Sequence, residues 1–443
     1  MSRLVVQAIS VFMTFVILAP SAVSSQQGLT TTQWRDDLNF MVSHMEKIHP
    51  VLFANVEETA FRRAAKELSD SLADMSDYEI IVDLLRLAAM LEDGHTRLHG
   101  NKLSDYWFPI RIEEFVDGLY ITAVSKEHSD LLGRLVIEIA GRPAKDVFEA
   151  VKAITPHDNE YSQIYTASLY LTMASTLSGL GLIEDSRKLT LTTMNPDAGK
   201  EMRTVRAREF ASDQDMSWFW LLNSVPVVDG LRIWDGHTSD ELPLYLQNVD
   251  KPYWFHHLED ESTVYVGFNL CAENPEEPFA DFNTNLWKLV EKEDVHYVVV
   301  DLRHNIGGTN SFVLPFVHEA IRHPMISGNG NLFVIIGRKT WSAAVHLATW
   351  LDFHVDPTFV GEPTGSGPNH YADPEALTLP NSQILLLVSR LYWQNSWPWD
   401  DRRWIAPDVP VEYTSDQYFD LSDPAMDRIR AIIEHNGVPR NQE

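Results

Sequence analysis

Residues 262–343 carry the pattern that most restricts the fold of this chain. Residues 295–302 and 332–336 are continuous apolar runs, which are typical of strands buried on both faces of a sheet. A third short strand is predicted at 264–268, and apolar residues recur at helical spacing from Phe279 to Val290. Strands that alternate with helices in this way predict an α/β core.

Two further blocks precede this core. Apolar residues recur at helical spacing in three segments of 34–91, and the third segment begins at a capping box, Ser76-x-x-Glu79. Short β-rich runs follow from about residue 108, whereas the stretch 203–257 is rich in Trp and Pro and shows no regular pattern. We therefore predict an α+β protein overall. Its predicted parts are a helical subdomain at 28–100, a β-rich module with an irregular insert at 105–257 and the α/β domain at 258–436.

The N-terminus has the features of an export signal. A lone charge at Arg3 is followed by an apolar stretch at 11–19 and by small residues at 21–25. We predict a signal peptide at 1–25 and a periplasmic or secreted mature protein. The alternative is an uncleaved membrane anchor, but the apolar run is short for a full span. No stable membrane insertion is expected once the signal is removed.

Composition narrows the classes of function. The formal net charge is −28, which argues against nucleic-acid binding because phosphate contacts need clustered Lys and Arg. Cys271 is the only cysteine, so no intramolecular disulfide can form. His256 and His257 lie near acidic residues, but adjacent His side chains often diverge. We therefore expect no metal and no cofactor, and the oligomeric state stays open.

A first candidate for chemistry is Ser342, in Gly337-Arg338-Lys339-Thr340-Trp341-Ser342-Ala343-Ala344. The predicted strand at 332–336 ends, a short turn follows and a helix begins near Ser342. A hydroxyl at this place lies at the positive end of a helix dipole, which suits a nucleophile. The alternative is an ordinary helix cap, the usual role of a serine at a helix start.

Three other segments are candidates for chemistry. Asp301-Leu302-Arg303-His304-Asn305-Ile306-Gly307-Gly308 follows a buried strand, and its adjacent glycines allow backbone N–H groups to approach a reacting carbonyl. Asp93-Gly94-His95-Thr96 places an imidazole after a helix. A Gly/Pro-rich stretch at 361–371 is predicted to be a loop. Taken singly, these segments fit a tight turn, a structural histidine and a plain loop.

Together and in this order, the four segments resemble the tail-specific protease family, also called the C-terminal processing peptidases, and within it the tricorn-core-like branch. The resemblance spans roughly residues 34–428, and Asp423-Pro424-Ala425-Met426 is similar to the closing helix of the family. It implies a crotonase-like (ClpP-like) catalytic core with a PDZ-like module. It also implies a serine-type peptidase that cleaves peptide or protein substrates near their C-termini, without a cofactor.

The resemblance also implies roles for particular residues. Ser342 would be the nucleophile and His95 the general base. A carboxylate a few residues before Pro407-Asp408 would orient that base, which leaves Asp400 or Asp401; counting back favours Asp401. No Lys follows Lys339, so the Ser–Lys dyad of another branch is excluded.

The remaining site residues follow from the same motifs. The oxyanion would be stabilised by the Ala343 N–H together with the N–H of Gly307 or Gly308. Thr340, Asn369 and His370 are the predicted substrate-binding residues.

A competing hypothesis is a non-catalytic binding protein of the same fold that holds an apolar ligand or a peptide. Retinoid-binding proteins of the photoreceptor matrix resemble this fold family. Trp393, Trp397, Trp399 and Trp404 lie close together in sequence and could line an apolar groove, or they could be ordinary core or interface aromatics. The presence of Ser342, His95 and both glycines favours the enzyme.

Overall fold

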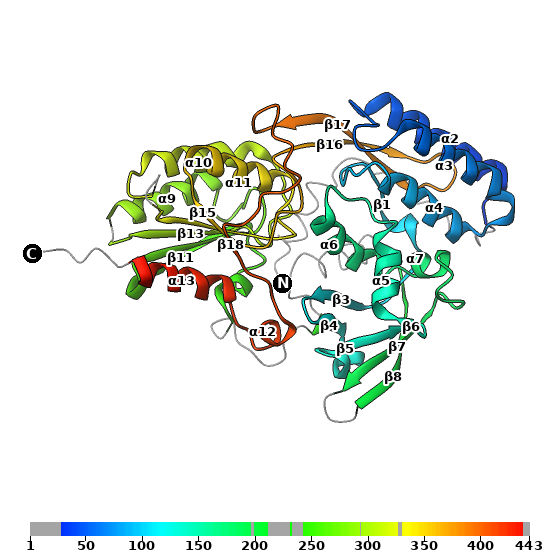
Figure 1. The fold of residues 1–443 in the computed structure, drawn as a ribbon, viewed down its shortest axis with the longest axis horizontal. Coiled ribbons are helices and arrows are strands. Elements are labelled where there is room, and N and C mark those ends of the chain that lie inside the picture. Colours follow the sequence, from blue (N-terminus) through cyan, green and yellow to red (C-terminus); the bar gives the residue numbers. More distant parts are fainter. Residues whose placement is uncertain are drawn as a thin grey trace, which may run out of the picture. The chain divides into compact units, whose positions relative to one another are not determined.

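The structure, a computed structural model, describes residues 28–195, 199–210, 231–232, 242–292, 294–326 and 330–436 (Figure 1). The predicted signal peptide and most of the irregular insert lie outside the described residues. The chain forms two compact units. The first contains residues up to 114, 119–233 and 369–393, and the second contains 115–118, 234–368 and 394–443. In the described residues, no helix is long and apolar enough to span a membrane.

Three helices open the first unit, as the periodicity predicts. They are α2 (Thr31–Ile48), α3 (Glu58–Ser71) and α4 (Asp77–Ala89). The predicted capping box at Ser76 is present, because the Ser76 hydroxyl accepts from the Glu79 N–H and the Glu79 carboxylate accepts from the Ser76 N–H. Trp34 joins α2 to α4 through a 2.7 Å hydrogen bond from its indole Nε1 to Asp77 Oδ1.

A seven-stranded sheet forms the second part of this unit. Its path is β10-β4-β5-β7-β8, with β3 paired to β4 and β6 paired to β5. The strands are β3 (Ile110–Phe115), β4 (Gly118–Ser125), β5 (Leu135–Ile139), β6 (Arg142–Pro143), β7 (Lys188–Asn195), β8 (Gly199–Arg206) and β10 (Leu231–Arg232). Helices α5 (Ala144–Lys152), α6 (Glu160–Tyr170) and α7 (Ala174–Gly179) interrupt it, and α7 packs against α4.

The prediction that 203–257 is irregular is wrong at both ends of that stretch. The hairpin of β7 and β8 extends to Arg206, because Leu189 and Val205 form a buried cross-strand pair that continues the ladder. At the other end, β11 (Tyr253–Leu258) pairs along its whole length with β12 (Thr263–Phe268).

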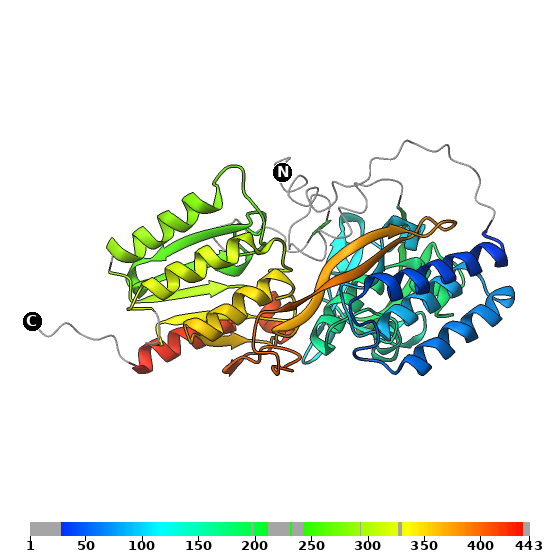
Figure 2. The same cartoon turned by 90° about the horizontal axis from the view of Figure 1, so that it is seen from above.

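A long hairpin from late in the sequence completes the first unit. It consists of β16 (Asn369–Thr378) and β17 (Leu385–Gln394), and β17 pairs antiparallel with β1 (Arg97–His99). The hairpin lies beside α2 (Figure 2). Asp37 of α2 binds the hairpin turn: it is fully buried and accepts from the N–H groups of Asn381 and Ser382 at 2.8 and 2.7 Å. The prediction of a loop up to residue 371 is therefore wrong at its end.

The second unit is built on a six-stranded sheet of order β11-β12-β13-β14-β15-β18. Only the β11–β12 pair is antiparallel, and the other neighbours are parallel. The remaining strands are β13 (Tyr297–Asp301), β14 (Leu332–Ile336), β15 (Thr358–Gly361) and β18 (Val409–Pro410). This arrangement confirms the predicted alternation of strand and helix.

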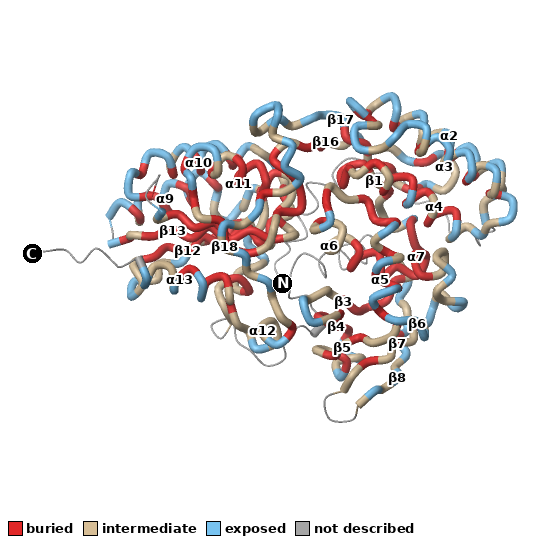
Figure 3. The backbone as a smooth tube through the Cα atoms, viewed as in Figure 1, coloured by how far each residue is buried: buried red, intermediate tan, exposed pale blue. Residues whose placement is uncertain are grey.

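Helices cover both faces of this sheet, so its central strands are buried throughout (Figure 3). Val298 and Val300 share a core with α9 (Phe279–Lys292), α10 (Val313–Arg322) and α11 (Ala343–His354). Val299, between them, packs on the other face with Met426 of α13 (Pro424–Asn436). Successive side chains of a strand point to opposite faces, so an unbroken apolar run is required here.

Candidate active site

Ser342 lies where β14 gives way to α11. Its backbone has φ 55° and ψ −126°, a left-handed conformation that is strained for a residue other than glycine. Its side chain makes no capping hydrogen bond to α11, whereas Ser76 at the start of α4 has extended backbone angles and caps its helix. The plain helix-cap interpretation therefore does not describe Ser342. A strained strand-to-helix turn is the geometry that exposes a nucleophilic hydroxyl in other hydrolase folds.

Thr340 holds the turn that leads into Ser342. Its side chain is fully buried; the hydroxyl accepts from the Gly337 N–H at 3.0 Å and donates to the Leu302 carbonyl at 2.9 Å. Its own carbonyl accepts from the Gly365 N–H at 2.9 Å. Thr340 thus ties the end of β13 to the nucleophile turn, and its contact with substrate stays a prediction.

Gly307 and Gly308 lie where no larger residue would fit, because Gly307 closely approaches the nucleophile turn and Gly308 closely approaches Cys271. Their φ angles are 102° and 131°. A Cβ on Gly307 would lie 2.6 Å from the Cβ of Ser342 and 3.0 Å from the Ala343 nitrogen, and one on Gly308 would lie 2.1 Å from the Cys271 carbonyl oxygen. Gly307 is therefore required by its close packing against Ser342, and Gly308 by its close packing against the Cys271 backbone.

Asn305 connects the segments that meet at this place. Its Nδ2 donates to the Phe268 carbonyl at 2.9 Å, its Oδ1 accepts from the Gly307 N–H at 2.9 Å, and its carbonyl accepts from the Trp341 N–H at 3.1 Å. The side chain is fully buried. The sequence interpretation did not single out Asn305, although it stands inside the 301–308 motif. Asn305 therefore links the end of a strand, the glycine loop and the nucleophile turn, and so helps to build the candidate site.

Two backbone donors remain beside Ser342. The Gly307 N–H is used by Asn305, whereas within the described residues the N–H groups of Gly308 and Ala343 donate to no protein acceptor. The Ala343 N–H also belongs to the first turn of α11, where the helix dipole favours negative charge. These two N–H groups are suited to bind an oxyanion, and they refine the predicted choice between Gly307 and Gly308.

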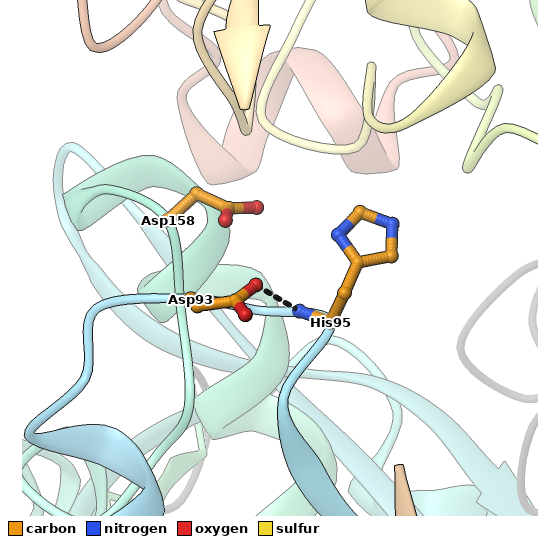
Figure 4. A group of neighbouring side chains, drawn as sticks. All are labelled: Asp93, His95 and Asp158. Carbon is orange, nitrogen blue, oxygen red and sulfur yellow. Dashed lines mark hydrogen bonds between the residues drawn. The ribbon is translucent and has the colours of Figure 1, made fainter. Parts of the chain in front are cut away.

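His95 belongs to the first unit, in the turn between α4 and β1 (Figure 4). The Asp93 carboxylate fixes the backbone of this turn, since its Oδ1 accepts from the His95 N–H at 2.9 Å and its Oδ2 lies 3.1 Å from His49 Nε2. Asp158 accepts from the Gly94 N–H at 3.0 Å. Two carboxylates thus lock the position from which the imidazole projects.

The environment of His95 favours the neutral imidazole. Burial lowers the pKa of His95 well below its ordinary value, and the charges of His370 and Arg97 lower it further, which outweighs the opposing effects of Asp93 and the Tyr371 backbone. The His95 ring stacks on that of His370, with centroids 5.9 Å apart and planes inclined by 9°. A general base must be neutral before it accepts a proton, so this environment suits that role.

The residues predicted to contact substrate on this side are Asn369 and His370. Both belong to β16, and His370 is buried against His95. The structure therefore gives His370 a packing role beside the predicted base, and contact of either residue with substrate stays a prediction.

One group of side chains has the spacing of metal ligands. Donor atoms of Asp93, His95 and Asp158 lie within 4.8 Å of one another (Figure 4). Both carboxylates already accept hydrogen bonds from the backbone of the same turn. These bonds account for the cluster without an ion, and we assign no metal to it.

The two candidates for the acid differ in their surroundings. Asp400 is engaged by Arg402 at 2.8 Å and by Ser396 at 2.6 Å, and the hydrogen bond from Arg402 is the main cause that lowers the pKa of Asp400 to about 2. Asp401 is exposed. The neighbouring motif residue Asp408 accepts from the Phe359 N–H at 2.8 Å and so anchors the start of β15. Asp400 is therefore committed to an ion pair, which leaves Asp401 as the predicted acid.

The predicted site residues thus form two groups. Ser342, Ala343, Gly307 and Gly308 come together in the second unit, which also contains Asp401. His95, Asn369 and His370 come together in the first unit, although the last two follow Ser342 in sequence. Joint action of the two groups is part of the proposal below.

The tryptophans of the competing hypothesis lie in different settings. Trp397 and Trp399 stack on each other with ring centroids 5.1 Å apart, and they are 53% and 74% exposed. Trp393 is half-buried and donates its indole N–H to Asp373. Two of the four rings therefore cover one another at the surface of the second unit.

No family model matches this chain, and no curated protein matches it either. Solved structures, in contrast, share its mixed helix and sheet fold over almost the whole chain. Mature CPAF is such a structure: it aligns with a TM-score of 0.64 and 13% identity, over 92% of this chain and 99% of the CPAF chain.

CPAF complexed with lactacystin aligns with a TM-score of 0.62 and 13% identity, over 90% of this chain and 98% of that chain. A photosystem II D1 C-terminal processing protease aligns over 90% of this chain and 97% of its own at 13% identity, but its TM-score of 0.39 is too low to argue from. The two CPAF alignments therefore show that this chain shares the fold of CPAF.

Proposed function

We propose that this chain is an exported serine-type peptidase of the tail-specific protease family, with Ser342 as its nucleophile. The observation that carries the proposal is the strained backbone of Ser342, at φ 55° and ψ −126°, with Gly307 packed against it. Strain of this kind costs on the order of 1–3 kcal/mol and persists where function requires it. The likeness to CPAF supports the proposal at the level of the fold.

The mechanism follows from the two groups of residues. Neutral His95 takes the proton of the Ser342 hydroxyl as its oxygen attacks the carbonyl carbon of the scissile bond. The N–H groups of Gly308 and Ala343 then stabilise the oxyanion of the tetrahedral intermediate. His95 returns the proton to the leaving amine, and water hydrolyses the acyl-enzyme by the same steps. Asp401 would hold the imidazole and stabilise its charged form.

The finer parts of the proposal concern architecture and location. The sheet of the second unit would be a crotonase-like (ClpP-like) catalytic core, and the β-rich part of the first unit a PDZ-like module. The substrate would be a peptide or protein, cleaved near its C-terminus. The mature protein would be periplasmic or secreted and begin near Ser25 or Gln26. Mass spectrometry of the exported form tests the last point, and a membrane-bound form that keeps Met1 would contradict it.

The decisive experiment labels the nucleophile. A fluorophosphonate probe should label the wild type and not Ser342→Ala, and only the wild type should give new products from a peptide library. Ser76→Ala is the matched control, because it removes a serine that only caps a helix. Identical product profiles for wild type and Ser342→Ala would disprove the peptidase. Quenching of Trp fluorescence by lipids without any labelling would favour the binding protein.

A second experiment tests the pairing of base and nucleophile. His95→Ala should reduce kcat by several orders of magnitude, comparable to Ser342→Ala, because the two residues act as a unit. The double variant should be little worse than either single variant. If the two losses multiply instead, His95 and Ser342 act independently and the mechanism fails.

A further inference from the structure

A buried ion-pair network lies at the end of β13, next to the glycine loop. Arg303 is 8% exposed and donates from both terminal nitrogens to Asp423, at 2.9 and 3.1 Å. Its Nε donates to Asp301 Oδ1 at 3.0 Å. Asp423 immediately precedes α13, so the guanidinium joins the end of a central strand to the start of the last helix.

Aromatic residues complete the network. The Tyr265 hydroxyl donates to Asp301 at 2.7 Å, the Tyr413 hydroxyl lies 3.3 Å from Asp423 and also accepts from Arg303, and the guanidinium carbon lies 4.5 Å from the ring centre of Tyr245. Burial acts to lower the pKa of Arg303, but the charges of Asp301 and Asp423 outweigh it and raise that pKa well above its ordinary value. The guanidinium is therefore permanently charged and held on several sides.

The network continues directly into the candidate active site. The Arg303 N–H donates to Asp301 Oδ1 at 3.0 Å, and the preceding carbonyl, that of Leu302, accepts from Thr340 of the nucleophile turn. Two residues beyond Arg303, Asn305 binds the Gly307 N–H. The backbone path from the ion pair to the Gly308 N–H is thus short, and hydrogen bonds fix it at Leu302, Arg303, Asn305 and Gly307.

We propose that Asp423 is a positioning residue for the oxyanion donors: through Arg303 it holds residues 303–308 in place against Ser342. The inference rests on the function proposed above. A bidentate Arg–carboxylate pair fixes direction as well as distance, which a single hydrogen bond would not do. Donor position matters because a displacement of about 1 Å near the reacting atoms can cost roughly 100-fold in rate.

The test is Asp423→Asn, which keeps the size of the side chain but removes the charge and one of the two acceptors. We expect kcat to fall roughly 100-fold with KM within about twofold, since oxyanion contacts form only in the transition state. The rate of fluorophosphonate labelling at Ser342 should fall in the same proportion. Asp427→Asn is the matched control, since Asp427 lies in the first turn of α13 in an exposed pair with Arg430 and its loss should leave both rates unchanged.

Every measurement is made at a temperature at which circular dichroism shows the variant folded. Unchanged kcat and labelling in folded Asp423→Asn would overturn the inference. A loss of kcat that the unfolded fraction of the variant fully explains would overturn it as well. If that variant does not fold, Arg303→Lys serves, because Lys keeps the charge and lacks the fork; the same loss of kcat is expected, and wild-type kcat would again overturn the inference. Failure of the wild type to label at Ser342 would identify the proposed function as wrong, and the inference would fall with it.

Discussion

Gly307→Ala perturbs the candidate site at its most crowded point. The new Cβ would lie 2.6 Å from the Cβ of Ser342 and 2.9 Å from the Trp341 carbonyl oxygen. Carbon atoms in contact are ordinarily about 3.5–4.0 Å apart, so the loop or the nucleophile turn must shift by roughly 1 Å. A shift of that size near the reacting atoms, or the loss of one oxyanion donor, costs about 10²–10³ in kcat.

The same change has a separate cost in stability. Alanine at a φ of 102° adds backbone strain of roughly 1–2 kcal/mol, and overpacking of the buried site adds about 1–3 kcal/mol. Gly330→Ala is the matched control, because Gly330 belongs to the same unit, has a φ of 70° and would have no atom within 4 Å of its new Cβ. It should carry the strain alone and leave activity unchanged.

The assay combines kcat/KM on a peptide substrate with urea denaturation. Gly307→Ala should lose both activity and stability, and Gly330→Ala should lose only a little stability. Wild-type kcat/KM in Gly307→Ala would refute the placement of the glycine loop beside the nucleophile.

Three further predictions concern titration and reactivity. Because burial lowers the pKa of His95, the acid limb of kcat/KM should lie below the ordinary value of about 6.5, and a limb at or above 6.5 in a pH–rate profile would contradict this. Burial and the charge of Arg97 lower the pKa of His99 to about 3. Between about pH 6.5 and 3 the unfolded chain therefore binds one more proton at His99 than the folded chain does, and the free energy of unfolding falls as the pH falls. The slope is at most about 1.4 kcal/mol per pH unit, and urea titrations of His99→Asn should show it reduced. Burial raises the pKa of Cys271 to about 12, so a thiol reagent should label it only in denaturant, and rapid labelling of the native protein would contradict its burial.

The elements that the sequence predicts well are those whose burial is uniform along the element. Residues 332–336 are predicted and observed as one strand, because a short apolar run without a break is typical of a strand covered on both faces. The strand β16 carries mixed burial and begins among the Gly and Pro of 361–371, which indicate turns, so local pattern gives little sign of it. The strand β17 begins with an apolar run at 385–388, which the prediction passed over. Its pairing with β1 is a long-range contact that periodicity cannot reveal.

The candidate site divides in the same way. Ser342, Gly307 and Gly308 have positive φ angles in segments that the sequence marks by adjacent glycines and by a strand-to-helix turn, and their catalytic roles stay predictions. Asn305 and Asp158 could not be singled out, because each acts by accepting a hydrogen bond from a backbone N–H. Asp158 accepts from Gly94, which is remote in sequence, and Asn305 accepts from Gly307. A carboxylate that accepts from a main-chain N–H has no pattern of its own.

The hairpin of β16 and β17 means that the chain cannot be divided at a single point. A fragment of residues 28–233 would leave β1 without its partner strand and the Asp37 carboxylate without its donors Asn381 and Ser382. It would also expose Leu98, which is fully buried and pairs with Leu386 in the whole chain, so such a fragment should be unstable by itself. Added as a separate peptide, residues 369–393 would restore what is missing, and folding would then depend on the concentration of the peptide. The first unit is therefore suited to fragment complementation, with residues 369–393 as the ligand of residues 28–233.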